Sequence, residues 1–292
     1  MGFRSSLEWG QGLFKTIQQR AGSVGVAVGT RGLRPDRDEE DRWVERHAHG
    51  RSDVERSGVE SYAANPHPEA TSANFHKKRG TTALSGGTNI LIDECTFLDN
   101  VVGVDMFDSR DMIILRSNFS GGRAAINVGN FSNPVIRNCT TRAHELYGIL
   151  LVHDSEASLY DNTVEGDFAA LFLLASANAV AYRNEFVGGT NSAVRFKTDC
   201  SVEFRENTFS PASSSYAIVL DTYPVDPNCE ILDLSGNYWT TTEPDSIAEL
   251  IWDGDDDPGN HAVVQYEPFL DGPVPVRHST LGQLKAQFRG NR

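Results

Sequence analysis

Gly148-Ile149-Leu150-Leu151 is one copy of a tetrapeptide that recurs along the middle of the chain. Each copy holds a small residue, an apolar residue, a variable residue and a second apolar residue. The other copies are Gly103-Val104-Asp105-Met106, Ala125-Ile126-Asn127-Val128, Ala170-Leu171-Phe172-Leu173, Ala193-Val194-Arg195-Phe196 and Ala217-Ile218-Val219-Leu220. Their first apolar residues are separated by 22, 23, 22, 23 and 24 residues. So regular a spacing predicts stacked supersecondary units.

A second landmark lies between the copies: a polar turn residue, in most copies followed two residues later by an apolar or aromatic one. The turn residues are Cys95, Ser117, Asn138, Asn162, Asn184, Asn207 and Asn237. Alternating apolar runs such as Ile90/Ile92 and Val202/Phe204 precede most of these turns, which predicts short strands separated by polar turns. The period is too short for helical hairpins, and the Leu-x-x-Leu-x-Leu consensus of leucine-rich repeats is absent.

On these two landmarks the chain resembles right-handed parallel β-helix proteins of the pectin-lyase-like type. The resemblance implies an all-β fold, a right-handed parallel β-helix of about seven coils with a C-terminal cap and an irregular N-terminal arm. We expect the β-helix and its cap over residues 81–270. Residues 1–80 are expected to be a poorly ordered segment with at most a short helix, and residues 271–292 a tail with a short helix. The inward columns should be Val104, Ile126, Ile149, Leu171, Val194 and Ile218.

Charge is distributed unevenly along the chain. Residues 1–80 hold 13 Lys and Arg against 11 Asp and Glu, whereas residues 81–292 hold 13 against 29. So acidic a body argues against a nucleic-acid partner, because neutralising phosphates needs clustered cations. No apolar run approaches the length of a membrane span, and no secretory signal is visible, although β-helices of this type are mostly exported.

The asparagines of the turn column suit left-handed backbone and hydrogen bonding to the next coil. Four cysteines are too few for a disulfide scaffold. Cys95 and Cys139 lie two coils apart, beyond disulfide reach. Cys200 and Cys229 open strands in neighbouring coils, so either a bridge or two stacked thiols fits them.

Ligands of this fold usually lie on the outward side chains of one sheet. Here the outward row between the inward residues is Asp105, Asn127, Leu150, Phe172, Arg195 and Val219. A second row ends in Lys197 and Asp221, which are one coil apart and predict an ion pair, and the loop edge adds Asp108 and His153. We interpret Asp105, Asn127, Phe172 and Asp221 as candidate substrate-binding residues, and Arg195, Lys197, His153 and Asp108 as candidate catalytic residues.

Three enzyme motifs are matched only in part. Arg195-Phe196-Lys197 resembles the Arg-Ile-Lys element of polygalacturonases, but the matching coils lack that family's acidic residues. Tyr147-Gly148 followed by His153-Asp154 resembles an element of mannuronan epimerases without its catalytic Asp. A pectate-lyase mechanism needs an Arg base beside clustered Asp, and Asp105 lies four coils from Arg195, roughly 19 Å.

The sequence implies no cofactor, with calcium as the alternative at the acidic run Asp253–Asp257. That run lacks the glycine and glutamate positions of an EF-hand. Two functions remain. The first is a secreted or cell-surface β-helix that is structural or binds a polysaccharide or cell-surface glycan without a complete catalytic set. The second is a polysaccharide lyase or glycoside hydrolase acting on an acidic polysaccharide.

Overall fold

The structure is a computed structural model. It describes residues 53–55, 60–63, 69–71, 74–76, 81–86, 88, 90–197, 201–221, 230–257, 259, 260 and 262–276. The chain divides into residues 1–43 and 44–292, and everything described belongs to the second unit.

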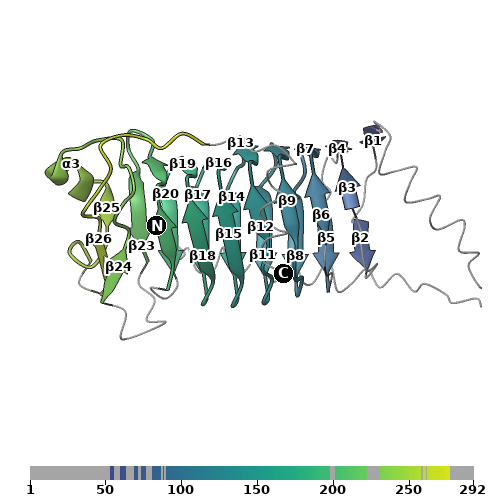
Figure 1. The fold of residues 1–292 in the computed structure, drawn as a ribbon, viewed down its shortest axis with the longest axis horizontal. Coiled ribbons are helices and arrows are strands. Elements are labelled where there is room, and N and C mark those ends of the chain that lie inside the picture. Colours follow the sequence, from purple (N-terminus) through teal and green to yellow (C-terminus); the bar gives the residue numbers. More distant parts are fainter. Residues whose placement is uncertain are drawn as a thin grey trace, which may run out of the picture. The chain divides into compact units, whose positions relative to one another are not determined.

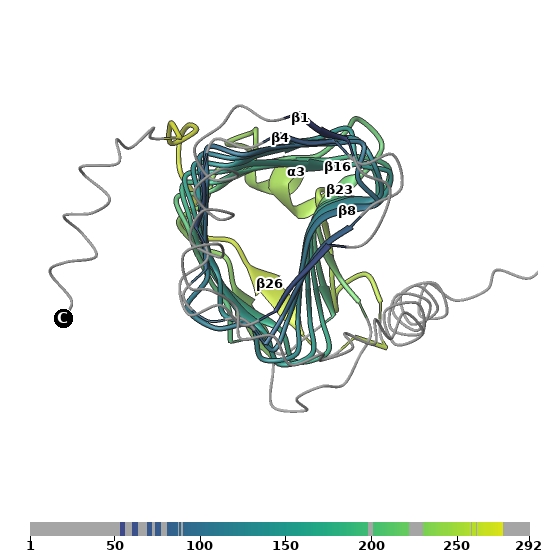
Figure 2. The ribbon, with the colours of Figure 1, turned by 90° about the vertical axis from the view of Figure 1, so that its right-hand side faces the viewer.

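Three parallel sheets form the walls of a β-solenoid, and each complete coil contributes one strand to each wall (Figures 1 and 2). The nine-stranded sheet contains β2 (Glu60–Ala63), β5 (Thr81–Ser85), β8 (Val102–Phe107), β11 (Ala124–Gly129), β14 (Tyr147–Val152), β17 (Ala169–Leu174), β20 (Ser192–Lys197), β23 (Tyr216–Leu220) and β25 (Ile251–Trp252). The expected all-β parallel β-helix is therefore confirmed.

The other two walls are built from shorter strands. The eight-stranded sheet contains β1 (Asp53–Glu55), β4 (Asn74–His76), β7 (Thr96–Leu98), β10 (Asn118–Ser120), β13 (Thr140–Arg142), β16 (Thr163–Gly166), β19 (Glu185–Gly188) and β22 (Thr208–Ser210). The seven-stranded sheet contains β3 (Glu69–Thr71), β6 (Leu91–Asp93), β9 (Ile113–Leu115), β12 (Val135–Arg137), β15 (Glu156–Tyr160), β18 (Asn178–Tyr182) and β21 (Glu203–Arg205).

The coils begin upstream of the boundary expected at residue 81. Strands β1 to β4 lie between residues 53 and 76, and they pair in register with later strands of the three sheets. Most of their residues are polar or charged, and the few apolar ones, such as Val54 and Phe75, give a weaker alternation than in the later coils. The short helices expected before residue 80 and after residue 271 lie outside the described residues, as do Cys200 and Cys229.

The expected inward columns form the core. Val104, Ile126, Ile149, Leu171, Val194 and Ile218 are all fully buried. Aromatic rings fill the same interior: Phe97 stacks on Phe119 with ring centroids 4.5 Å apart, and Phe209 contacts Trp239 at 4.8 Å. Because each coil covers only its neighbours, this column packing carries the stability from coil to coil.

In the described coils from residue 94 onward, one corner turns through a residue with positive φ. These residues are Glu94, Arg116, Asn138, Asp161, Arg183, Glu206 and Gly236, with φ between 45° and 71°. The next residue points inward, and in the later coils it is a buried asparagine. Asn162, Asn184, Asn207 and Asn237 form a ladder in which each backbone N–H donates to the side-chain oxygen of the next asparagine, at 2.9 to 3.0 Å.

Asn138 is not part of this ladder, although the repeat places it in the same column of turn residues. It occupies the left-handed corner, and Cys139 takes the ladder position, its N–H donating to Asn162 Oδ1 at 2.9 Å. Both Cys95 and Cys139 are buried, and no disulfide joins them, as expected.

The last coil ends in a short helix and a small sheet. Helix α3 (Pro244–Ala248) buries Ile247, and β24 (Ile231–Asp233) pairs in parallel with β26 (Val263–Gln265). Tyr266 and Phe269 pack against the core cluster beside Trp239. This terminal strand and its aromatic residues are the C-terminal cap that the sequence predicts.

Candidate functional site

The outward row of the nine-stranded sheet has the register that the repeat predicts. Asp105 pairs with Asn127, Asn127 with Leu150, Leu150 with Phe172, Phe172 with Arg195, and Arg195 with Val219. Asp105, Asn127, Phe172 and Arg195 point away from the core, yet none exposes more than 8% of its surface. The polar members of the row are therefore largely shielded from water.

Arg195 is the centre of a polar cluster at the β20–β23 end of this face. Its Nη2 lies 2.8 Å from Asp221 Oδ2, and its Nη1 donates to Asn191 Oδ1 at 2.6 Å. Lys197 Nζ lies 3.5 Å from the same Asp221 oxygen, so the expected ion pair is confirmed and is shared with Arg195. One carboxylate is thus bound by two cations. The sequence did not reveal Asn191, because a turn residue four positions before Arg195 carries no motif.

An apolar cluster lies beside Arg195 on the same face. It contains Val102, Ala124, Tyr147, Ala169 and Phe172, with Leu150, Phe168 and Leu174 packed against it. The guanidinium carbon of Arg195 lies 5.4 Å from the ring centre of Phe168 and 5.8 Å from that of Phe172. Stacking against aromatic faces holds the Arg195 side chain flat against the sheet.

Asp105 and Asn127 form a separate polar pair on the same face, and they lie four and three coils, respectively, from Arg195. Asn127 Nδ2 donates to Asp105 Oδ1 at 2.7 Å, and among the described residues nothing donates to the buried Asn127 Oδ1. Burial raises the pKa of the Asp105 carboxyl to about 7, although the hydrogen bond from Asn127 opposes the rise. Near neutral pH this carboxyl is therefore poised between its two protonation states.

Asp108 and His153 lie at the turn edge, which follows the β8, β11, β14 and β17 strands. Both are exposed and both have left-handed backbone, with φ of 50° and 52°. They belong to coils two apart, so roughly 10 Å separates their backbones along the axis. Asn130, Phe131 and Asp154 occupy the same turn edge, and Phe131 is 59% exposed. Phe131 is a residue that the sequence pattern did not single out.

The structure thus gathers the predicted site residues into three separate groups. Arg195, Lys197, Asp221 and Phe172 lie together, Asp105 and Asn127 lie together, and His153 and Asp108 stand at the turn edge. Asp105 and Asp221 are five coils apart, roughly 24 Å by the strand spacing. A pair of carboxyl groups that hydrolyses a glycoside needs a separation of about 5 to 9.5 Å.

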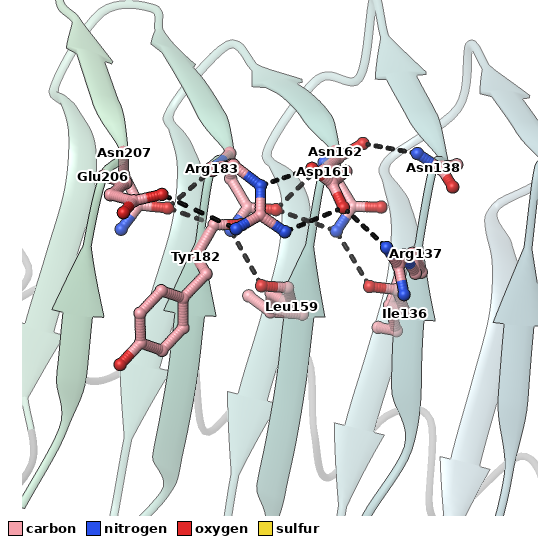
Figure 3. Close-up of polar contacts among 11 residues, drawn as sticks. Ile136, Arg137, Asn138, Leu159, Asp161, Asn162, Tyr182, Arg183, Glu206 and Asn207 are labelled. Carbon is pink, nitrogen blue, oxygen red and sulfur yellow. Dashed lines mark hydrogen bonds and ion pairs between the residues drawn. The ribbon is translucent and has the colours of Figure 1, made fainter. Parts of the chain in front are cut away.

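The corner of the seven- and eight-stranded sheets carries a further set of charges (Figure 3). The fully buried Asp161 carboxylate receives Arg183 Nε at 2.8 Å and Arg137 Nη2 at 3.2 Å, from the coils on either side. Glu206 lies 3.5 Å from Arg183 in the next coil. Charges of alternating sign along this corner pair with one another across successive coils, so removing one partner would leave a buried charge uncompensated.

The acidic loop proposed for calcium uses its first carboxylate internally. Asp253 Oδ2 accepts from Val264 N at 2.6 Å, and Asp253 Oδ1 accepts from Asp255 N at 3.0 Å. Within the part of the chain that the structure describes, no group of three or more His, Cys, Asp or Glu side chains is arranged to hold a metal ion. Calcium at this loop stays a prediction.

Over the same described ranges, no helix has the length and hydrophobicity to cross a membrane. The sequence matches the family model described as a right-handed beta helix region over residues 57–209, with a second, overlapping match over residues 117–233. Overlapping matches are typical of repeats that can be aligned in more than one register. Searches of curated proteins and of solved structures gave no significant match.

Proposed function

Because the chain belongs to the right-handed β-helix family, we propose that it is an extracellular or cell-surface protein that binds a glycan without cleaving it. The single observation that carries this proposal is the internal pairing of the charged groups on the nine-stranded sheet. Arg195 and Lys197 share Asp221, and Asp105 is hydrogen-bonded to Asn127. A cation that is already bound to a carboxylate of the chain is a poor partner for a uronate carboxylate. It is also a poor base for removing a proton from the substrate, because the ion pair favours its protonated form.

The buried pairs suit a scaffold for an adjacent binding surface. They fix the outward face with charge-assisted hydrogen bonds and aromatic packing, which leaves few side chains free to move. The turn edge next to this face carries the exposed residues Asp108, His153 and Asp154 and the half-buried Asn130. A glycan chain lying along the axis would meet a new polar side chain every 4.8 Å or so. Rows of hydroxyl-binding groups on a rigid support favour recognition of a polymer.

Affinity electrophoresis through gels that contain soluble polysaccharides tests the proposal. The panel should include a neutral β-glucan, xylan, alginate and polygalacturonate. We expect at least one of them to retard the protein, and His153→Ala to reduce the retardation. Thr163→Ala on β16, in a different wall, is the matched control and should behave as the wild type. A protein that no polysaccharide retards would contradict glycan binding.

A second candidate, a polysaccharide lyase or glycoside hydrolase acting on an acidic polysaccharide, is favoured by one observation. The raised pKa of Asp105, about 7, is suited to a group that donates or accepts a proton at neutral pH. This function predicts unsaturated or new reducing ends from alginate or polygalacturonate, and their loss in Asp105→Asn. The absence of both products from wild-type protein that binds these polymers would exclude it.

A further inference from the structure

Phe131 combines two features that oppose stability. Its backbone is left-handed, with φ of 61°, directly after Asn130 at 49°. Its side chain is also 59% exposed, and it is one of two exposed large hydrophobic side chains among the described residues. A bulky side chain at positive φ is a conformational outlier that destabilises the folded chain. Neither packing nor backbone preference therefore accounts for a phenylalanine at this position.

The same turn in the following coils uses residues that tolerate the conformation better. His153 and Asp154 have φ of 52° and 56°, and Ala175 and Ser176 have 56° and 60°. The N–H of Phe131 donates to His153 O, and the N–H of Asp154 donates to Ala175 O, so Phe131 and Asp154 are equivalent positions. Small polar residues such as Asp and Ser fit this position, because their side chains hydrogen-bond locally. Phe131 departs from that preference.

The turn is held so that the ring cannot relax inward. The buried Ser132 hydroxyl donates to Gly129 O at 2.7 Å and accepts from Ser109 N at 3.0 Å in the preceding coil. Asn133 accepts from Asp111 N at 2.9 Å on the other side of the turn. A strained residue that its surroundings fix and expose is a candidate for ligand contact.

We propose that Phe131 is a stacking residue for a sugar ring of the bound glycan, an inference that rests on the proposed function. The apolar C–H face of a pyranose packs on an aromatic ring, and its hydroxyl groups need polar partners at the rim. Asn130 precedes Phe131 in the same turn, and His153 and Asp154 occupy the equivalent turn of the next coil, so these three residues are placed to supply such partners. Among the described residues the other exposed large hydrophobic side chain, Ile231, lies on β24 outside this turn column, so the two do not form a common apolar patch.

The test compares Phe131→Asn with Ile231→Asn, which removes the other exposed hydrophobic residue. Both variants and the wild type are measured for melting temperature, for self-association by sedimentation velocity, and for binding to the polysaccharide that retards the wild type most. We expect Phe131→Asn to melt at the same or a higher temperature, since Asn accepts left-handed backbone. Its affinity should fall roughly tenfold, the scale of losing one stacked ring. Ile231→Asn should bind as the wild type.

The outcomes separate this inference from the function on which it rests. Wild-type binding that Phe131→Asn leaves unchanged overturns the role of Phe131 and leaves glycan binding intact. A lower melting temperature of Phe131→Asn would assign the ring to structure instead. Self-association lost only in Phe131→Asn would make this turn a contact between two copies and overturn the sugar assignment. If no polysaccharide binds the wild type, both proposals fail.

Discussion

The guanidinium of Arg195 lies 2.8 Å from the carboxylate of Asp221, one coil further along the β-helix. Their side chains are only 10% and 18% exposed, and Lys197 lies 3.5 Å from the same oxygen. This shared carboxylate gives two of the predicted catalytic cations a structural role. The proposed binding scaffold differs in this respect from an enzyme of acidic polysaccharides, because such an enzyme would need these cations open to the substrate.

Arg195→Ala should reduce the stability of the β-helix and leave glycan binding within about twofold of the wild type. The change leaves Asp221 with Lys197 alone and removes the packing on Phe168 and Phe172, at a cost of about 2 kcal/mol. Urea denaturation followed by circular dichroism measures the loss, and affinity electrophoresis measures binding. Unchanged stability combined with abolished binding would show that Arg195 contacts the ligand instead.

The asparagine ladder should make Asn184→Ala one of the most destabilising single changes. Asn184 Oδ1 accepts from Asn162, and its Nδ2 donates to Leu159 O and Asn207 Oδ1 in a fully buried site. Its removal leaves several buried groups without partners, at about 3 kcal/mol or more. The exposed Asn118 on β10 is the control, and Asn118→Ala should change stability by at most about 0.5 kcal/mol. Equal effects of the two changes would contradict the ladder.

Cys139→Asn should extend the ladder by one coil. The Cys139 thiol already contacts Ile114 O at 3.6 Å, the carbonyl equivalent to Ile136 O, to which Asn162 donates at 2.9 Å. An asparagine here could donate to Ile114 O and to Asn162 Oδ1, which should raise the unfolding free energy by about 1 kcal/mol. Thermal denaturation measures the change. A clear fall in melting temperature would show that the site is too small for the carboxamide.

Asp105→Asn should stabilise the protein at neutral and alkaline pH. The folded-state pKa of Asp105, about 7, lies above the ordinary value of 3.8, so the unfolded state releases its proton first as pH rises. This carboxyl therefore lowers stability progressively between pH 4 and pH 7, by about 4 kcal/mol at the upper end. Wild type and variant are compared by denaturation at pH 4 and pH 8. The advantage of the variant should appear only at pH 8, and equal stability there would contradict the raised pKa.

His144 should give the opposite pH dependence. Its ring is buried, which lowers its pKa to about 4, and the nearby carbonyls of Phe119 and Gly121 offset this only in part because neither forms a hydrogen bond of ordinary geometry. As pH falls below 6.5, His144 becomes protonated in the unfolded state but stays neutral in the folded state. The free energy of unfolding therefore falls by about 3 kcal/mol by pH 4.

The variant His144→Asn isolates this effect, since it lacks the titrating group. Between pH 7 and pH 4, the difference in unfolding free energy between variant and wild type should shift in favour of the variant by about 3 kcal/mol. Parallel pH profiles for the two proteins would mean that His144 is protonated in the folded state as readily as in water.

The repeat predicted the fold because inward residues such as Ile126 and Ile149 must stack at a fixed period, and that period also placed Asp105, Asn127 and Arg195 on one outward row. It did not predict strands between residues 53 and 76, because these strands are short and mostly polar, and apolar residues such as Val54 and Phe75 are too sparse to mark the repeat. The exchange of Asn138 for Cys139 in the ladder was missed as well, because corner and ladder positions are adjacent and both accept Asn. Backbone strain at Phe131 has no sequence signature, since φ depends on how Ser132 fixes the turn.

The most direct test of non-catalytic glycan binding measures binding and cleavage in the same samples. Wild-type protein is equilibrated with each polysaccharide of the panel, the bound fraction is determined, and the supernatant is assayed for unsaturated uronates and for reducing ends. We predict at least one polymer that binds the protein and yields neither product above the protein-free control. Products that accumulate with wild-type protein and disappear with Asp105→Asn would contradict the account and assign the chain to the polysaccharide-degrading enzymes.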